Sequence, residues 1–74
     1  MSYIYRLRVD SVPNGERSIR TVYGIDAYDE ESGKMIEISD VFSNRDAAVG
    51  FVERCNDLQL SIIHLREAIE DALE

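Results

Sequence analysis

The chain has little of several residue types on which small proteins often depend. Its 74 residues include one Cys, one His, one Pro and no Trp. One cysteine cannot form a disulfide within the chain, and one cysteine with one histidine cannot complete a metal site in a monomer. A lone cysteine fits a reducing compartment. We therefore expect a cytoplasmic protein that holds no cofactor and no metal.

Long apolar runs are also missing. No stretch approaches the roughly 20 apolar residues of a membrane-spanning helix. The N-terminal stretch MSYIYRLR is charged by its sixth residue and lacks the apolar core of a signal peptide. The sequence therefore predicts no membrane partner.

Basic residues are scarce, with 8 Lys and Arg against 15 Asp and Glu and a net charge of −7. Binding to phosphate backbones depends on Lys and Arg, so this balance disfavours nucleic acid as a partner. The charge is unevenly placed. Residues 1–22 carry four arginines against two acids, a net charge of +2, whereas residues 23–74 carry four bases against thirteen acids, a net charge of −9.

The overall composition is that of one globular domain over residues 1–74. Hydrophobic residues make up 45% of the chain and charged residues 31%, which argues against disorder. A chain of this length buries only about 60% of the surface that its unfolded state exposes. The core is therefore expected to be thin, which favours association with another molecule.

The first half of the chain alternates between apolar and polar residues, as β-strands do. Pro13, Asn14 and Gly15 predict a hairpin with a three-residue loop that closes through a G1 bulge. In that register Val9 faces Ile19, and the apolar residues of both strands share one face. This expected inner face comprises Tyr3, Tyr5, Leu7, Val9, Ile19, Thr21, Tyr23, Ile25 and Ala27. A third strand over residues 35–41 adds Ile36 and Ile38.

The second half changes to helical spacing. Ser43 is the expected N-cap of a first helix, with Asp46 completing an approximate capping box. Its apolar stripe is Ala48, Phe51, Val52 and Cys55. Gly50 would allow a close approach to the sheet, and Asn56-Asp57 would end the helix.

A second helix is expected to begin at Ser61, with Leu60 and Leu65 spaced as a hydrophobic staple. Its apolar stripe is Ile62, Leu65, Ile69, Ala72 and Leu73. The predicted fold is α+β, a three-stranded antiparallel β-meander followed by two α-helices packed on one face of the sheet (β-β-β-α-α).

The opposite sheet face mixes arginines with apolar side chains. In the predicted register the residues of interest on it are Ile4, Arg6, Arg8, Arg20, Val22 and Tyr28, and Asp26, Met35, Glu37 and Ser39 share the face. One interpretation is a solvated face with cross-strand pairs between arginines and acids. Another is a protein-recognition face, since Arg and Tyr beside apolar residues are typical of interfaces. A third is a site for a phosphate or carboxylate.

Cys55 and His64 form the only combination that would suit nucleophilic catalysis. Cys55 lies on the expected apolar stripe, and free cysteines are among the most buried residues. No Gly-rich oxyanion loop accompanies the pair, and a thin domain has little room for a deep pocket. We therefore expect no catalytic residue and no enzyme activity.

Several short motifs follow one another along the chain, namely Tyr23-Gly24-Ile25, the segment 36–41, Cys55-Asn56, His64-Leu65 and Ile69-Glu70-Asp71. Their order, over roughly residues 3–73, resembles a family of small bacterial proteins from Gram-positive anaerobes that is classed as a domain of unknown function. The resemblance implies a bacterial cytosolic protein that is complete at this length. It supplies no activity, substrate, cofactor or functional residue.

Two hypotheses about function follow. The first is a non-enzymatic interaction or regulatory accessory protein that forms a homodimer or binds another protein. It rests on the mixed sheet face and on the strand edges that a three-stranded sheet leaves unpaired. The alternative is a sensor of small anions or phosphate ligands that uses Arg6, Arg8 and Arg20.

Overall fold

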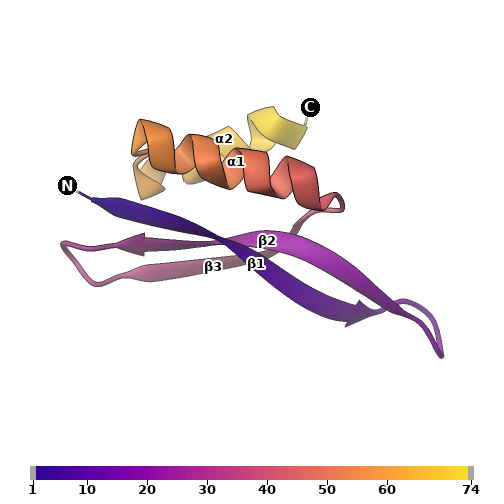
Figure 1. Cartoon of the computed structure of the whole chain (residues 1–74). Coiled ribbons are helices and arrows are strands. Elements are labelled where there is room, and N and C mark those ends of the chain that lie inside the picture. Colours follow the sequence, from indigo (N-terminus) through magenta and orange to yellow (C-terminus); the bar gives the residue numbers. More distant parts are fainter. Residues whose placement is uncertain (1, 74) are drawn as a thin grey trace.

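A computed structural model describes residues 2–73 of the chain. Its elements follow in the order β1 (Tyr3–Pro13), β2 (Ile19–Asp29), β3 (Met35–Phe42), α1 (Arg45–Leu58), the 3-10 turn η1 (Ile62–His64) and α2 (Leu65–Leu73). The strands form one antiparallel sheet in the order β1-β2-β3. Both helices cover the same face of that sheet (Figure 1). The predicted α+β fold is confirmed.

The first hairpin pairs in a different register from the predicted one. Val9 lies opposite Tyr23 and Pro13 opposite Ile19. The predicted three-residue loop is therefore wrong: the loop spans residues 14–18 and is closed by a 2.9 Å hydrogen bond from the Asn14 N–H to the Ser18 carbonyl. This loop keeps a polar segment out of the ladder. The register differs from the prediction by an even number of residues, so every side chain keeps its predicted face.

The observed register also gives the ring of Tyr5 a small partner on the neighbouring strand. Tyr5 lies opposite Ala27, whereas the predicted register set it opposite Tyr23. Small partners leave room for the Tyr5 ring beneath the helices, where the ring is only 2% exposed. Packing of the core thus selects this register over the tighter turn.

A bulge in β3 interrupts its pairing with β2. Ile25 lies opposite Ile38, but Tyr23 lies opposite Phe42, so residues 39–41 face the single residue Gly24. Asp40 in the bulge has a φ of 55°, in the left-handed region. A Cβ at position 24 would lie 2.0 Å from the Ile38 carbonyl oxygen. Only glycine fits at this crossing.

Helix α1 begins one residue later than expected, because Asn44 and not Ser43 is its N-cap. The Asn44 Oδ1 accepts hydrogen bonds from the Asp46 N–H at 2.8 Å and the Ala47 N–H at 3.2 Å. The predicted stripe is confirmed as the buried face, formed by Ala48, Phe51, Val52 and Cys55. The expected close approach at Gly50 is wrong, since a Cβ there would meet nothing within 4 Å.

The segment after α1 is less regular than predicted. Ser61 precedes η1 rather than a continuous helix and makes no side-chain capping bond. Leu65, at the start of α2, is 2% exposed, whereas Leu73 near its end is 57% exposed. The predicted stripe is therefore buried at its beginning and open at its end.

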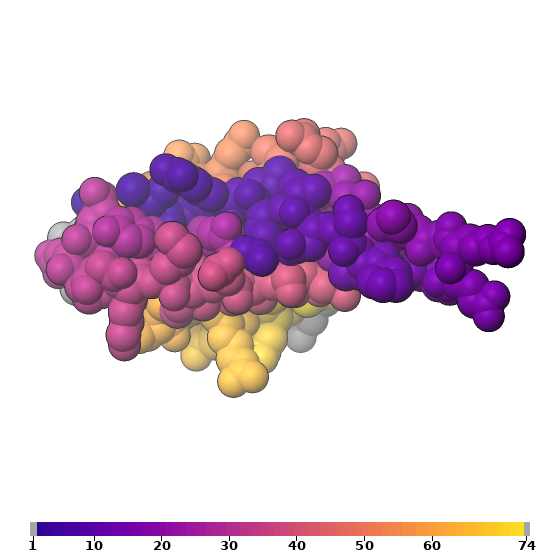
Figure 2. All heavy atoms as spheres, turned by 90° about the horizontal axis from the view of Figure 1, so that it is seen from below, coloured from indigo at the N-terminus to yellow at the C-terminus, as the bar shows by residue number. Residues whose placement is uncertain are grey.

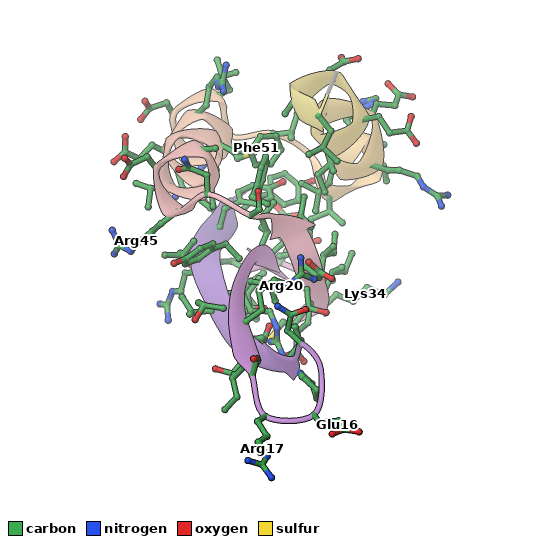
Figure 3. All side chains as sticks on the ribbon, turned by 90° about the vertical axis from the view of Figure 1, so that its right-hand side faces the viewer. Glu16, Arg17, Arg20, Lys34, Arg45 and Phe51 are labelled. Atoms are coloured by element: carbon green, nitrogen blue, oxygen red, sulfur yellow. The ribbon has the colours of Figure 1, made fainter. Side chains whose placement is uncertain are left out.

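The core lies between the sheet and the helices. Figure 3 shows Phe51 directed into the space between α1 and α2 above the sheet. Its ring centroid lies 5.5 Å from that of Phe42. The buried cluster comprises Tyr3, Tyr5, Ile25, Ala27, Phe42, Ala48, Phe51, Val52, Cys55 and Leu65. It is one contiguous layer of side chains, as expected for a thin core.

The hairpin of β1 and β2 extends past β3 and the helices, which gives the molecule extents of 45 × 26 × 17 Å (Figures 1 and 2). We call residues 9–23 the arm. Glu16 and Arg17 lie at its tip (Figure 3). Val9 and Ile19 belong to the face that packs under the helices elsewhere, yet they are 55% and 76% exposed. At Val9 and Ile19 the core face of the sheet therefore continues into the arm, where the helices do not cover it.

Candidate functional site

All six residues of the predicted interaction face lie on the sheet face opposite the helices, as the strand alternation requires. Arg6 and Arg20 are exposed, and Ile4, Arg8 and Tyr28 are partly buried. Val22 is 0% exposed, so its expected place in an open apolar patch is wrong. The β3 bulge contacts β2 on both sides of this position: its backbone crosses Gly24, and its Asp40 carboxylate lies 3.6 Å from the Arg20 guanidinium. Val22 lies between these two contacts.

Arg8 connects all three strands on this face. Its Nε donates to Asp10 of β1 at 2.8 Å, and its Nη1 donates to Asp26 of β2 at 3.1 Å and to Glu37 of β3 at 2.5 Å. The hydrogen bonds to Asp26 and Glu37 raise the pKa of the guanidinium. The Nε and Nη1 donors of Arg8 are therefore engaged by the protein itself.

The outer face is not a basic patch. Its three arginines, Arg6, Arg8 and Arg20, share it with four acids that pair with Arg8 and Arg20, namely Asp10, Asp26, Glu37 and Asp40. An incoming anion would meet more negative than positive charge. This arrangement matches the interpretation of cross-strand ion pairs on a solvated face.

The free edge of β1 carries a feature that the sequence analysis missed. The Asn56 side chain accepts from the Tyr5 N–H at 2.8 Å and donates to the Tyr5 carbonyl at 2.9 Å. Gln59 makes the same two bonds to Tyr3, each at 3.0 Å. The carboxamides of Asn56 in α1 and of Gln59, the C-cap of this helix, thus replace a neighbouring strand at this edge. Their i,i+3 spacing beside the apolar stripe was the available signal, but Asn56 was assigned only to the helix end.

Beyond the amide caps, the same edge continues into the arm. Both backbone groups of Tyr3 and Tyr5 point away from β2, so in the regular ladder those of Leu7, Val9 and Ser11 do too. Pro13 follows at the next position with this orientation and has no N–H to offer. The uncapped part of the edge is therefore the short stretch from Leu7 to Ser11.

Cys55 and His64 differ sharply in their surroundings. Cys55 is 4% exposed, and burial raises the pKa of its thiol, whereas His64 is exposed. A groove of about 260 Å³ between the helices includes Cys55 and Phe51 in its wall. Within residues 2–73, no three His, Cys, Asp or Glu side chains gather as metal ligands would. A buried thiol with a raised pKa is a poor nucleophile.

Tyr5 makes the stability of the fold sensitive to alkaline pH. Burial, the main cause, raises the pKa of its hydroxyl from 10.0 to about 12. The neutral form is favoured in the folded state, so stability is fully present below pH 10 and is lost as the pH rises toward 12. We expect a loss of about 2 to 3 kcal/mol over this interval, measured by urea denaturation at a series of pH values.

Tyr5→Phe is the control for this titration. It removes the hydroxyl that donates to the Leu60 carbonyl, which lowers the stability at neutral pH by about 1 kcal/mol. It should also flatten the decline above pH 10. An equally steep decline in the variant would assign the effect to other groups.

Comparisons of the chain with protein-family models, with curated proteins and with solved structures found no match. The resemblance to a bacterial family stays a prediction. No helix in the described part of the chain is long and apolar enough to cross a membrane.

Proposed function

We propose that this protein is a non-enzymatic interaction module that acts in the cytoplasm as a small regulatory or accessory protein and self-associates as a homodimer. The observation that carries the proposal is the arm. Its inner face continues the core face of the sheet beyond the helices, with Val9 and Ile19 exposed. Apolar side chains on such a face indicate a surface that another molecule covers.

Two further features support this proposal over an enzyme or an anion sensor. Large apolar side chains are also exposed outside the arm, for example at Met35, Leu58 and Ile63. The arginines suggested for anion binding share their face with four carboxylates. The exposed apolar side chains therefore favour binding of a protein, and the carboxylates beside the arginines disfavour binding of a phosphate.

The oligomeric state tests the proposal. We expect sedimentation velocity to show a dimer as the protein concentration is raised to about 100 μM. Ile19→Ser should weaken the dimer by about tenfold, since it removes an apolar side chain from the arm. Leu73→Ser, at the far end of α2, serves as the matched control and should leave the dimer unchanged. A monomer throughout this range contradicts self-association.

A further inference from the structure

We propose that two copies of the chain associate through the uncapped edge of β1, paired antiparallel about a two-fold axis at Val9. The two sheets would then form one continuous six-stranded sheet. This inference rests on the proposed function and specifies its surface, its partner and its register. The occupant of the edge is a second copy of this chain.

The residues that bound the uncapped edge of β1 determine where the two-fold axis of the pairing lies. On one side, Tyr5 already has both backbone groups bonded to Asn56. On the other side, Pro13 has no N–H. Between them, the outward-facing residues are Leu7, Val9 and Ser11, a set that is symmetric about Val9. A two-fold pairing that uses all three must place Val9 opposite Val9 and Leu7 opposite Ser11.

Charge selects the same register. With the axis at Val9, Arg8 of each copy lies opposite Asp10 of the other copy, in a position where side chains are closest. An axis at Arg8 would oppose two arginines, and an axis at Asp10 would oppose two aspartates. Like charges directly opposite each other destabilise a sheet. Of these three registers, only the one centred on Val9 is complementary.

The pairing also covers the exposed side chains of the arm. Val9, which is 55% exposed, meets its own copy across the axis. A two-fold axis perpendicular to the sheet keeps the helices of both copies on the same face. The Asn56 carboxamide already occupies the place opposite Tyr5, so the strand of the other copy would turn away from β1 after Val12. Helix α1 of one copy is nevertheless brought to the part of the arm where Pro13 pairs with the exposed Ile19.

The other edge of the sheet is less suited to pairing. In β3, the backbone groups of Ile36 and Ile38 point toward their partners Ala27 and Ile25 of β2. Those of Met35, Glu37 and Ser39 therefore face outward. The bulge at residues 39–41 breaks the line of backbone groups immediately after Glu37. Bulges and charged side chains are common protections of edge strands. We therefore assign the contact to β1.

Cysteine cross-linking tests the register. In the proposed dimer Arg6 lies opposite Val12 of the other copy, at a position without strand hydrogen bonds. Arg6→Cys and Val12→Cys are made separately in a Cys55→Ala background and then mixed under mild oxidation. We expect a disulfide-linked dimer in the mixture, because the facing Cα atoms would be about 4.5 Å apart.

Each variant alone is the matched control. Two copies of position 6, or two of position 12, would be six residues apart along the strands, about 20 Å. Neither variant should cross-link by itself. Efficient cross-linking of Arg6→Cys alone, or none in the mixture while the chain is dimeric, overturns this register.

Val9→Pro tests the backbone pairing. It removes an N–H that faces away from β2, so the fold of each copy is retained. By symmetry the dimer loses two hydrogen bonds, and we expect its dissociation constant to rise about 30-fold. Val9→Thr keeps the N–H and should stay dimeric. Circular dichroism checks that Val9→Pro is folded; if it is not, the cross-linking result decides.

The outcomes separate the two proposals. A wild-type chain that is monomeric up to about 100 μM removes both. A dimer that survives Val9→Pro and gives no cross-link in the mixture overturns only the pairing of β1, and self-association then uses another surface. A dimer weakened by Val9→Pro and cross-linked only in the mixture supports both.

Discussion

Gly24→Ala is expected to unfold the chain. The added Cβ would lie 2.0 Å from the Ile38 carbonyl oxygen and 2.9 Å from the Ser39 Cα. Both obstacles are backbone atoms of the bulge in β3, so no rotation of a side chain can relieve the overlap. The bulge would have to move away from β2 at this crossing. We expect a loss of more than about 3 kcal/mol, which is comparable to the whole stability of a domain of this size.

Gly50→Ala is the matched control, since it adds the same methyl group in open space. In the interior of helix α1, alanine should raise the free energy of unfolding by about 0.5 to 1 kcal/mol. Circular dichroism during thermal denaturation measures both variants. A cooperative transition for Gly24→Ala within a few degrees of the wild type would show that the bulge is not held against β2 as described.

Asn56→Leu is expected to have the second largest effect. Leucine has similar volume but cannot bond to the Tyr5 backbone, which loses partners at 2.8 and 2.9 Å. Tyr5 is only 2% exposed, so water replaces these bonds poorly. Two unpaired groups correspond to a loss of about 2 to 4 kcal/mol. Urea denaturation monitored by tyrosine fluorescence provides the measurement.

Glu53→Ala is the control for this variant, because it removes an exposed polar side chain from the preceding turn of α1. It should change the stability by less than about 0.5 kcal/mol. The slope of the denaturation curve shows whether Asn56→Leu is folded, because only a folded variant gives a cooperative transition. Equal stabilities of the two variants would mean that the carboxamide contributes little to the edge.

The period of the sequence was sufficient to predict which side each strand residue faces. Alternation along residues 3–10 and 19–27 needs no knowledge of the partner strand, so these assignments survived a register that was predicted wrongly. Register itself depends on where large rings find space. Tyr5 lies opposite Ala27 because the helices must close over the ring, and a turn motif such as Pro13-Asn14-Gly15 carries no information about that constraint.

Contacts between distant backbone segments could not be predicted in the same way. Gly24 was noted only as part of a resemblance, because nothing in its neighbours reveals that β3 bulges across it. Asn56 was expected to end a helix, a role that follows from its own backbone preferences. Its bonds to Tyr5 join residues 51 positions apart. The side of the sheet on which the six candidate residues lie was predicted correctly, whereas the capped edge required the folded structure.

The bulge of β3 has a consequence for how large an assembly can grow. A sheet with two regular edges adds copies without limit, and that is the route to fibrils. Here the irregular backbone at residues 39–41 and the left-handed Asp40 interrupt one border of the sheet. In the proposed dimer, pairing at the opposite border by a two-fold axis would use up the edge that remains. Growth would then end at two copies, limited by the same distortion that requires glycine at position 24.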